Sequence, residues 1–213
     1  MNSDTADVAL GILIVVVALP VLYFMAGFAR KIGEVWSARI LAPLAPLLGS
    51  EAKLSAGSLR GIYQGCDLRA FYGKDKNDGW DDTLNSVGFN AFYIEVMDIP
   101  GQYNWVVTFC FSGLLGQGPK LLVIQAADKD LGERLARTDV VALVSNVSTP
   151  SEDYVTVAFD ARRKVLTYTD DVSPRSVPSA KQFRAQLDLV VRLVEINAEV
   201  NRGYRADESP LSP

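Results

Sequence analysis

The pattern of hydrophobic and polar positions divides the chain into an apolar start and an alternating remainder. Residues from Val8 to Ala29 include no charged side chain. As a helix, such a run extends about 30 Å, which matches the hydrocarbon core of a bilayer. It is longer than the apolar part of a secretory signal, and no Lys or Arg precedes it. The pattern therefore predicts a single, retained transmembrane helix.

Helical spacing continues beyond this run, with polar residues now interspersed. Ile32, Val35, Trp36 and Ile40 recur at that spacing until Pro43 interrupts it. One interpretation is an interfacial helix that lies on the membrane or on a partner, with the Trp36 indole at headgroup level. The other is a continuation of the anchor that leads into the core of the following domain.

Period-two alternation dominates the middle of the chain and predicts a β-rich domain. The expected strands are Leu59–Gln64, Cys66–Tyr72, Asn90–Met97, Asn104–Phe111, Leu121–Ala126, Val140–Val144, Tyr154–Phe159 and Lys164–Thr169. A short helix is expected over Asp128–Arg137. The turn residues of Asp98–Gln102 predict a hairpin between the strands on either side of them. Consecutive strands without long crossovers favour antiparallel pairing.

The last predicted element is a long helix over Ala180–Asn201. Ser179 and Gln182 have the spacing of a capping box at its start. Its polar residues form one narrow stripe, so apolar side chains occupy two sides. One side is expected to pack on the sheet. The other side, formed by Leu189, Leu193, Ile196 and Val200, either contacts a partner or is covered by the same domain.

These elements predict an α+β fold class. We expect a single N-terminal transmembrane helix, then a mostly antiparallel β-rich domain closed by a long C-terminal helix. The expected boundaries are a flank over 1–7, the transmembrane helix over 8–29, an amphipathic segment and linker over 30–50, the α+β domain over 51–203 and a disordered tail over 204–213.

Charge bears on orientation and on partners. The chain has 21 Lys and Arg against 25 Asp and Glu, a net charge of −4, which argues against nucleic-acid binding. Basic residues Arg30, Lys31 and Arg39 follow the apolar run, whereas acidic residues precede it. The positive-inside rule then predicts an N-terminus outside and a cytoplasmic domain. A second basic cluster, Arg162, Arg163 and Lys164, is expected at a turn that either touches anionic headgroups or is simply solvated.

Candidate chemistry is sparse. The chain contains no histidine, which excludes Ser-His-Asp catalysis and histidine-ligated metals. Cys66 and Cys110 are expected to be unpaired and buried, the alternative being a disulfide if the strands bring them together. The glycine-rich run 113–120 lacks the Lys-Ser/Thr ending of a phosphate loop, and the acidic run 75–86 fits a calcium loop poorly. We therefore expect no cofactor, no metal and no enzymatic activity.

The function that fits these expectations is a non-enzymatic, membrane-anchored accessory subunit or interaction module of a larger membrane complex, such as a transport or energy-transducing complex. Its expected partners are the lipid bilayer and other subunits of that complex. The contact candidates are Trp36, Trp80, Leu189, Leu193, Ile196 and Val200, and the membrane-surface candidates are Arg30, Lys31, Arg39, Arg162, Arg163 and Lys164. The alternatives are a membrane-tethered sensor whose aromatic strand Tyr103–Phe111 lines a small apolar or lipid ligand, and an enzyme that works with carboxylate, Lys or Tyr chemistry.

Overall fold

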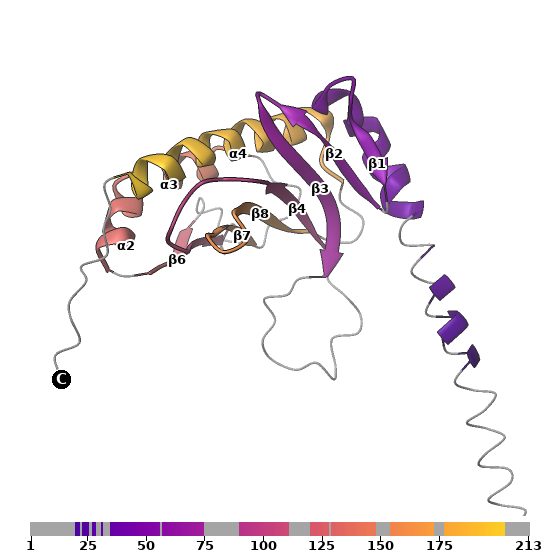
Figure 1. Cartoon of the computed structure of the whole chain (residues 1–213), viewed down its shortest axis with the longest axis horizontal. Coiled ribbons are helices and arrows are strands. Elements are labelled where there is room, and N and C mark those ends of the chain that lie inside the picture. The colour runs from indigo at the N-terminus through magenta and orange to yellow at the C-terminus, as the bar shows by residue number, and fades with distance from the viewer. Residues whose placement is uncertain are drawn as a thin grey trace, which may run out of the picture.

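The described part of the chain contains one antiparallel sheet with helices on one side (Figure 1). The computed structural model describes residues 20–21, 23–25, 27–28, 31, 35–55, 57–74, 90–110, 120–127, 129–147, 154–172 and 177–202. The strands are β1 (Lys53–Ser55), β2 (Ser58–Tyr63), β3 (Cys66–Lys74), β4 (Asn90–Val96), β5 (Trp105–Cys110), β6 (Lys120–Ala126), β7 (Tyr154–Asp160) and β8 (Val165–Val172). The helices are the 3₁₀-helix η1 (Ala42–Leu48), α2 (Lys129–Ala136), α3 (Val140–Ser145) and α4 (Ala180–Asn201). The predicted α+β class, the antiparallel sheet and the long C-terminal helix are confirmed.

The strand order within the sheet is β1-β2-β3-β4-β8-β7-β5-β6. The β2–β3 hairpin turns through Gln64 and Gly65, whose φ angles of 48° and 83° give the left-handed pair that a two-residue hairpin turn requires. The predicted hairpin between β4 and β5 is wrong, because β7 and β8 lie between these two strands. Turn residues at 98–102 mark a change of direction but do not select the strand's partner. The connection is instead fixed to the β7–β8 turn, where Ile99 N donates to Lys164 O at 2.9 Å.

A second expectation is also wrong, since Val140–Val144 forms the helix α3 rather than a strand. A short apolar run fits a buried helix as well as a strand. Val140 and Val144 are four residues apart, so a helix places both on one face, and both are fully buried. This face of α3 packs toward α4, and burial there determines the helical conformation.

The hydrophobic core lies between the sheet and the helical layer. Its largest fully buried side chains are Trp105, Tyr168, Phe92, Phe109, Phe159 and Phe183. They come from alternate positions of the central strands and from α4, so one face of each strand points toward the helices. The capping box is confirmed: Ser179 Oγ accepts from Gln182 N at 3.2 Å, and Gln182 Oε1 accepts from Ser179 N at 2.9 Å.

The predicted transmembrane span over 8–29 lies largely outside the described residues. No helix in the described part of the chain is both long enough and apolar enough to cross a membrane. Beyond the predicted span, residues 35–41 are helical and run into η1. Leu41, Leu44 and Leu48 are buried in the core. The end of this segment therefore packs into the domain, while Val35 and Trp36 before it are 69% and 40% exposed.

Candidate interaction surface on the open sheet face

The sheet has one face that no described helix covers, which we call the open face. Strand alternation places every second side chain there, opposite the buried core positions. The open face is formed by Arg69 and Phe71 of β3, Tyr93 and Glu95 of β4, Thr167 and Thr169 of β8, Thr156 of β7, and Val106 and Thr108 of β5.

An aromatic stack occupies the β3–β4 part of the open face. Phe71 is the register partner of Tyr93, and their ring centroids are 5.0 Å apart with an interplanar angle of 10°. The Arg69 guanidinium lies 4.6 Å from the centroid of the Phe71 ring, within cation–π range. These side chains project from rigid paired strands, so their positions are set by the backbone.

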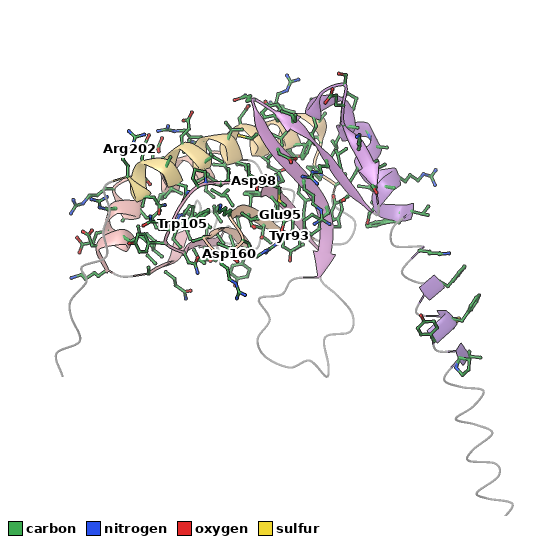
Figure 2. The ribbon with its side chains drawn as sticks, viewed as in Figure 1. Tyr93, Glu95, Asp98, Trp105, Asp160 and Arg202 are labelled. Atoms are coloured by element: carbon green, nitrogen blue, oxygen red, sulfur yellow. The ribbon has the colours of Figure 1, made fainter. Side chains whose placement is uncertain are left out.

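A nearly buried carboxylate holds two arginines beside this stack. Glu95 is 6% exposed, and Figure 2 shows it close to Tyr93 on the same strand. Its oxygens lie 3.7 Å from Arg69 Nη1 and 3.4 Å from Arg163 Nη2. A carboxylate this buried requires paired charges. The Arg163 side chain thus reaches from the β7–β8 turn to the open face.

The middle of the open face is polar but uncharged. Thr169, Thr156 and Thr108 are register neighbours on β8, β7 and β5. The hydroxyls of Thr108 and Thr156 are 3.3 Å apart and share a hydrogen bond. This row runs from the aromatic and arginine side chains to Val106, and Thr169 within it is only 8% exposed.

A groove of about 720 Å³ lies at the end of the sheet beside Val106. Its walls come from the β4–β5 connection, the end of β6 and the β7–β8 turn, and the described lining residues include Gln102, Tyr103, Val106, Gln125, Ala126 and Arg162. Asn104 Oδ1 accepts a hydrogen bond from Ala161 N at 2.8 Å, which links the β4–β5 connection to the β7–β8 turn.

Two asparagines of α4 bind the β4–β5 connection from the helical side of the sheet. Asn197 Oδ1 accepts from the Trp105 indole at 2.8 Å, and Asn197 Nδ2 donates to Pro100 O at 2.9 Å. Asn201 Oδ1 accepts from Gln102 N at 3.1 Å. A side chain at Gly101 would clash with the Phe159 ring, since a Cβ there would lie 2.4 Å from it. Hydrogen bonds and close packing therefore fix the β4–β5 connection, which forms one wall of the groove.

Titratable groups also lie on the buried side of the sheet. Tyr168 and Asp170 are fully buried, and Gln186 Nε2 donates to both, at 3.4 and 3.3 Å. Burial, followed by the Asp170 charge, raises the pKa of Tyr72 well above its usual range. These groups face α4 rather than solvent. Among the described residues, no three carboxylate or cysteine side chains gather where they could hold a metal ion.

The helix residues predicted as partner contacts lie in the interior. Leu189, Leu193, Ile196 and Val200 are at most 4% exposed and belong to the core cluster of this domain. Of the two possibilities for the second apolar side of α4, the structure shows coverage by the domain itself. Sheet and surrounding helices enclose α4 on both sides, which a helical wheel alone does not reveal.

The other predicted residues lie nearer the surface or outside the described residues. Trp36 is 40% exposed and meets the Tyr72 ring edge-on, with centroids 6.0 Å apart. Lys31, Arg39, Arg162, Arg163 and Lys164 are exposed, the last three on the predicted β7–β8 turn. Trp80 and Arg30 are outside the described residues. Of the predicted aromatic ligand-binding strand, Trp105 and Phe109 are in the core, and Tyr103 lines the groove. Cys66 is a free, half-buried thiol.

Sequence reasoning missed Arg69, Phe71, Tyr93 and Glu95. A signal was present, because each pair is separated by one apolar residue and so shares a strand face opposite the core. What the sequence lacked was the order of the strands, which brings the two pairs and Arg163 together.

No protein-family model matches the sequence, and no curated protein matches it. Among solved structures, the chain is similar to the crystal structure of the mycobacterial trehalose monomycolate transport factor A, TtfA. The identity is 14% and the TM-score 0.41, over 68% of this chain and 71% of that chain. A likeness at this level carries no argument about function.

Proposed function

We propose that this chain is a membrane-anchored, non-enzymatic accessory or interaction module of a larger membrane complex, with a cytoplasmic domain that meets its partner through the open face. The observation that carries the proposal is the exposure of apolar side chains at the N-terminal end. Val21, Tyr23, Phe24, Met25 and Phe28 lie in helical residues and are 53–84% exposed.

Exposure of this kind is costly in water. Apolar surface contributes about 25 cal/mol per Å² when it is removed from water. None of these five side chains belongs to the core cluster of the described residues, which gathers most of the large apolar side chains from η1 to α4. A bilayer would remove their surface from water without a protein partner. Lys31 and Arg39 follow on the domain side and are exposed, which supports a cytoplasmic domain under the positive-inside rule.

The open face is the surface that best suits a protein partner. Tyr, Phe and Arg are enriched at interface cores, where rigid aromatic side chains lose little conformational entropy on binding. The Phe71–Tyr93 stack and Arg69 offer this chemistry on paired strands. Across the molecule, the outer side of α4 presents ion pairs such as Arg192–Glu195 at 2.6 Å, and exposed pairs of this kind contribute little to binding.

Two measurements test the proposal. Extraction of native membranes with alkaline carbonate should leave the full-length chain in the membrane pellet, and Phe24→Asp with Met25→Asp should release it. Pull-down of the tagged chain in mild detergent should recover a stoichiometric partner. Arg69→Ala with Tyr93→Ala should lose that partner, whereas Arg192→Ala, an arginine substitution on the opposite layer, should retain it. Recovery of the chain alone, or release of the unmodified chain by carbonate, would contradict the proposal.

A further inference from the structure

The groove beside Val106 has the chemistry of a small-molecule site. Its volume of about 720 Å³ is within the roughly 300–1,000 Å³ typical of ligand clefts. Apolar side chains and neutral amides form the walls, and Arg162 is the only charged residue among the described residues that line it. A ligand here would meet apolar surface along most of its length and one positive charge.

The charge of Arg162 is not neutralised within the described part of the chain. Its neighbour Arg163 pairs with Glu95 at 3.4 Å, and Arg60 pairs with Asp67 at 2.6 Å. The nearest acidic side chain in the turn, Asp160, accepts from the backbone N–H groups of Arg162 and Arg163, both at 3.0 Å. These bonds fix the turn and do not involve the guanidinium of Arg162, an exposed side chain that lines the groove, and the donors of a guanidinium suit a carboxylate.

The groove lies far from the proposed anchor. Ring contacts from Trp36 to Tyr72, Tyr72 to Phe92 and Phe92 to Phe183 connect the anchor side to the start of α4. The groove is held by Asn197, near the other end of that helix. Fourteen residues of helix separate Phe183 from Asn197, or about 21 Å at 1.5 Å per residue. If the proposed anchor holds the Trp36 side of the domain at the bilayer, a phospholipid would have to leave the bilayer to reach the groove, and a single-chain ligand that dissolves in water is favoured.

We propose that this groove binds a single-chain anionic amphiphile, with a carboxylate head at Arg162 and an apolar chain along Tyr103, Val106 and Ala126. This goes beyond the proposed function, because it does not need the open-face partner; only the choice of a single chain over a phospholipid rests on the proposed membrane anchor. The hydrogen bonds of the connection over 100–104 keep the walls of the groove in place before binding, which reduces the conformational entropy lost when the ligand binds.

Photolabelling of the full-length chain in phosphatidylcholine nanodiscs tests the proposal. The probe is a decanoate that carries a diazirine, and labelled residues are mapped by mass spectrometry. We expect labelling at 101–106, 125–127 and 161–162, and competition by unlabelled fatty acids. A fully buried methylene contributes about 0.8 kcal/mol, or about four-fold in affinity, so in this open groove we expect about two-fold per methylene. Dodecanoate should therefore compete about four-fold better than decanoate.

Three variants test whether the carboxylate head of the ligand binds at Arg162. Arg162→Gln and the isosteric Gln125→Glu should each weaken decanoate binding about ten-fold, because one removes the positive charge and the other adds a negative charge. Both positions are exposed, so neither substitution should affect folding. Lys164→Gln removes a positive charge from the same turn, outside the lining residues, and should leave binding unchanged. Labelling confined to residues 20–48, equal labelling of all variants, or competition independent of chain length would each overturn the proposal.

Discussion

Substitution of Asn197 by Ala should destabilise the domain far more than an ordinary helix substitution. Asn197 is fully buried, and its side chain takes part in three hydrogen bonds, with the Trp105 indole, Pro100 O and Asn201 Nδ2. Alanine leaves the indole N–H without an acceptor in the core. It also removes the donor that fixes the connection between β4 and β5.

The magnitude follows from these contacts. A buried donor left unsatisfied costs about 1–3 kcal/mol, and a further hydrogen bond at a half-buried carbonyl about 1 kcal/mol. We therefore expect Asn197→Ala to lower the free energy of unfolding by about 2–4 kcal/mol, a large part of the roughly 5–15 kcal/mol of a typical domain. Asn201→Ala, one turn further along α4 and less buried, is the matched control and should cost about 1 kcal/mol.

The assay is urea unfolding of the full-length chain in nanodiscs, with circular dichroism as the signal that reports unfolding. A double-mutant cycle with Trp105→Phe isolates the indole bond and should give a coupling energy of about 1–2 kcal/mol. Hydrogen exchange should show faster exchange at the amide of Gln102 in Asn197→Ala. A loss of stability no larger than that of Asn201→Ala, or strict additivity with Trp105→Phe, would refute the assignment of this network.

Three further predictions concern the core and the titratable groups. Leu193→Ala should lower the free energy of unfolding by about 2–5 kcal/mol because the side chain is fully buried; a change below 1 kcal/mol in the same urea assay would show that it is not. Burial raises the pKa of Tyr72 above its usual value of about 10. The unfolded chain therefore loses the Tyr72 proton at lower pH than the folded protein does, so the free energy of unfolding is unaffected below about pH 10 and falls as the pH rises toward the folded-state pKa. Its hydroxyl has no hydrogen-bond partner among the described residues, so Tyr72→Phe should keep or raise stability at pH 7 and unfold at higher pH than the parent, and an earlier alkaline transition would contradict this. The hydrogen bond from Arg60 lowers the pKa of Asp67, which gives stability that is present above about pH 4 and lost as the pH falls toward the folded-state pKa. Asp67→Asn should reduce the acid sensitivity of unfolding by less than about 1 kcal/mol, since the pair is exposed; a larger effect in an acid titration would show a different role.

Local signals in the sequence predicted the elements whose structure is determined locally. The break between the expected strands Leu59–Gln64 and Cys66–Tyr72 is a tight turn at Gln64–Gly65, and the capping box at Ser179 has the expected geometry, because each depends on neighbouring residues alone. Strand β1 was missed, since a strand of three exposed residues has no apolar alternation to detect. The run at Val140 was misread because its helical form depends on burial against α4, which lies about forty residues away in the sequence.

The same distinction applies to the candidate site. Alternation in β4 indicated that Tyr93 and Glu95 share a face, but the partner of that face could not be predicted. The β4–β5 turn suggested β5 as the neighbour, whereas the neighbour is β8. Only this order brings Arg163, which follows β7, to within 3.4 Å of Glu95. A surface assembled by non-local strand pairing therefore has no signature within any one segment.

The arrangement in two layers also bears on where the proposed partner would bind. One layer is the sheet, and the helices form the other, so the domain offers an outer helical surface and the open face. The apolar sides of α4 are occupied, and its exposed stripe carries charges that include the ion pairs of Arg192 with Glu195 and Glu199, at 2.6 and 3.6 Å. Solvated ion pairs must be desolvated on binding and regain little. The open face instead presents an aromatic stack whose neighbouring arginines are already held by Glu95, and burial of such rings gives a net gain. If the proposed partner binds through this domain, complex formation should therefore respond to substitutions at Phe71 and Tyr93 and not to substitutions in the exposed charged stripe of α4.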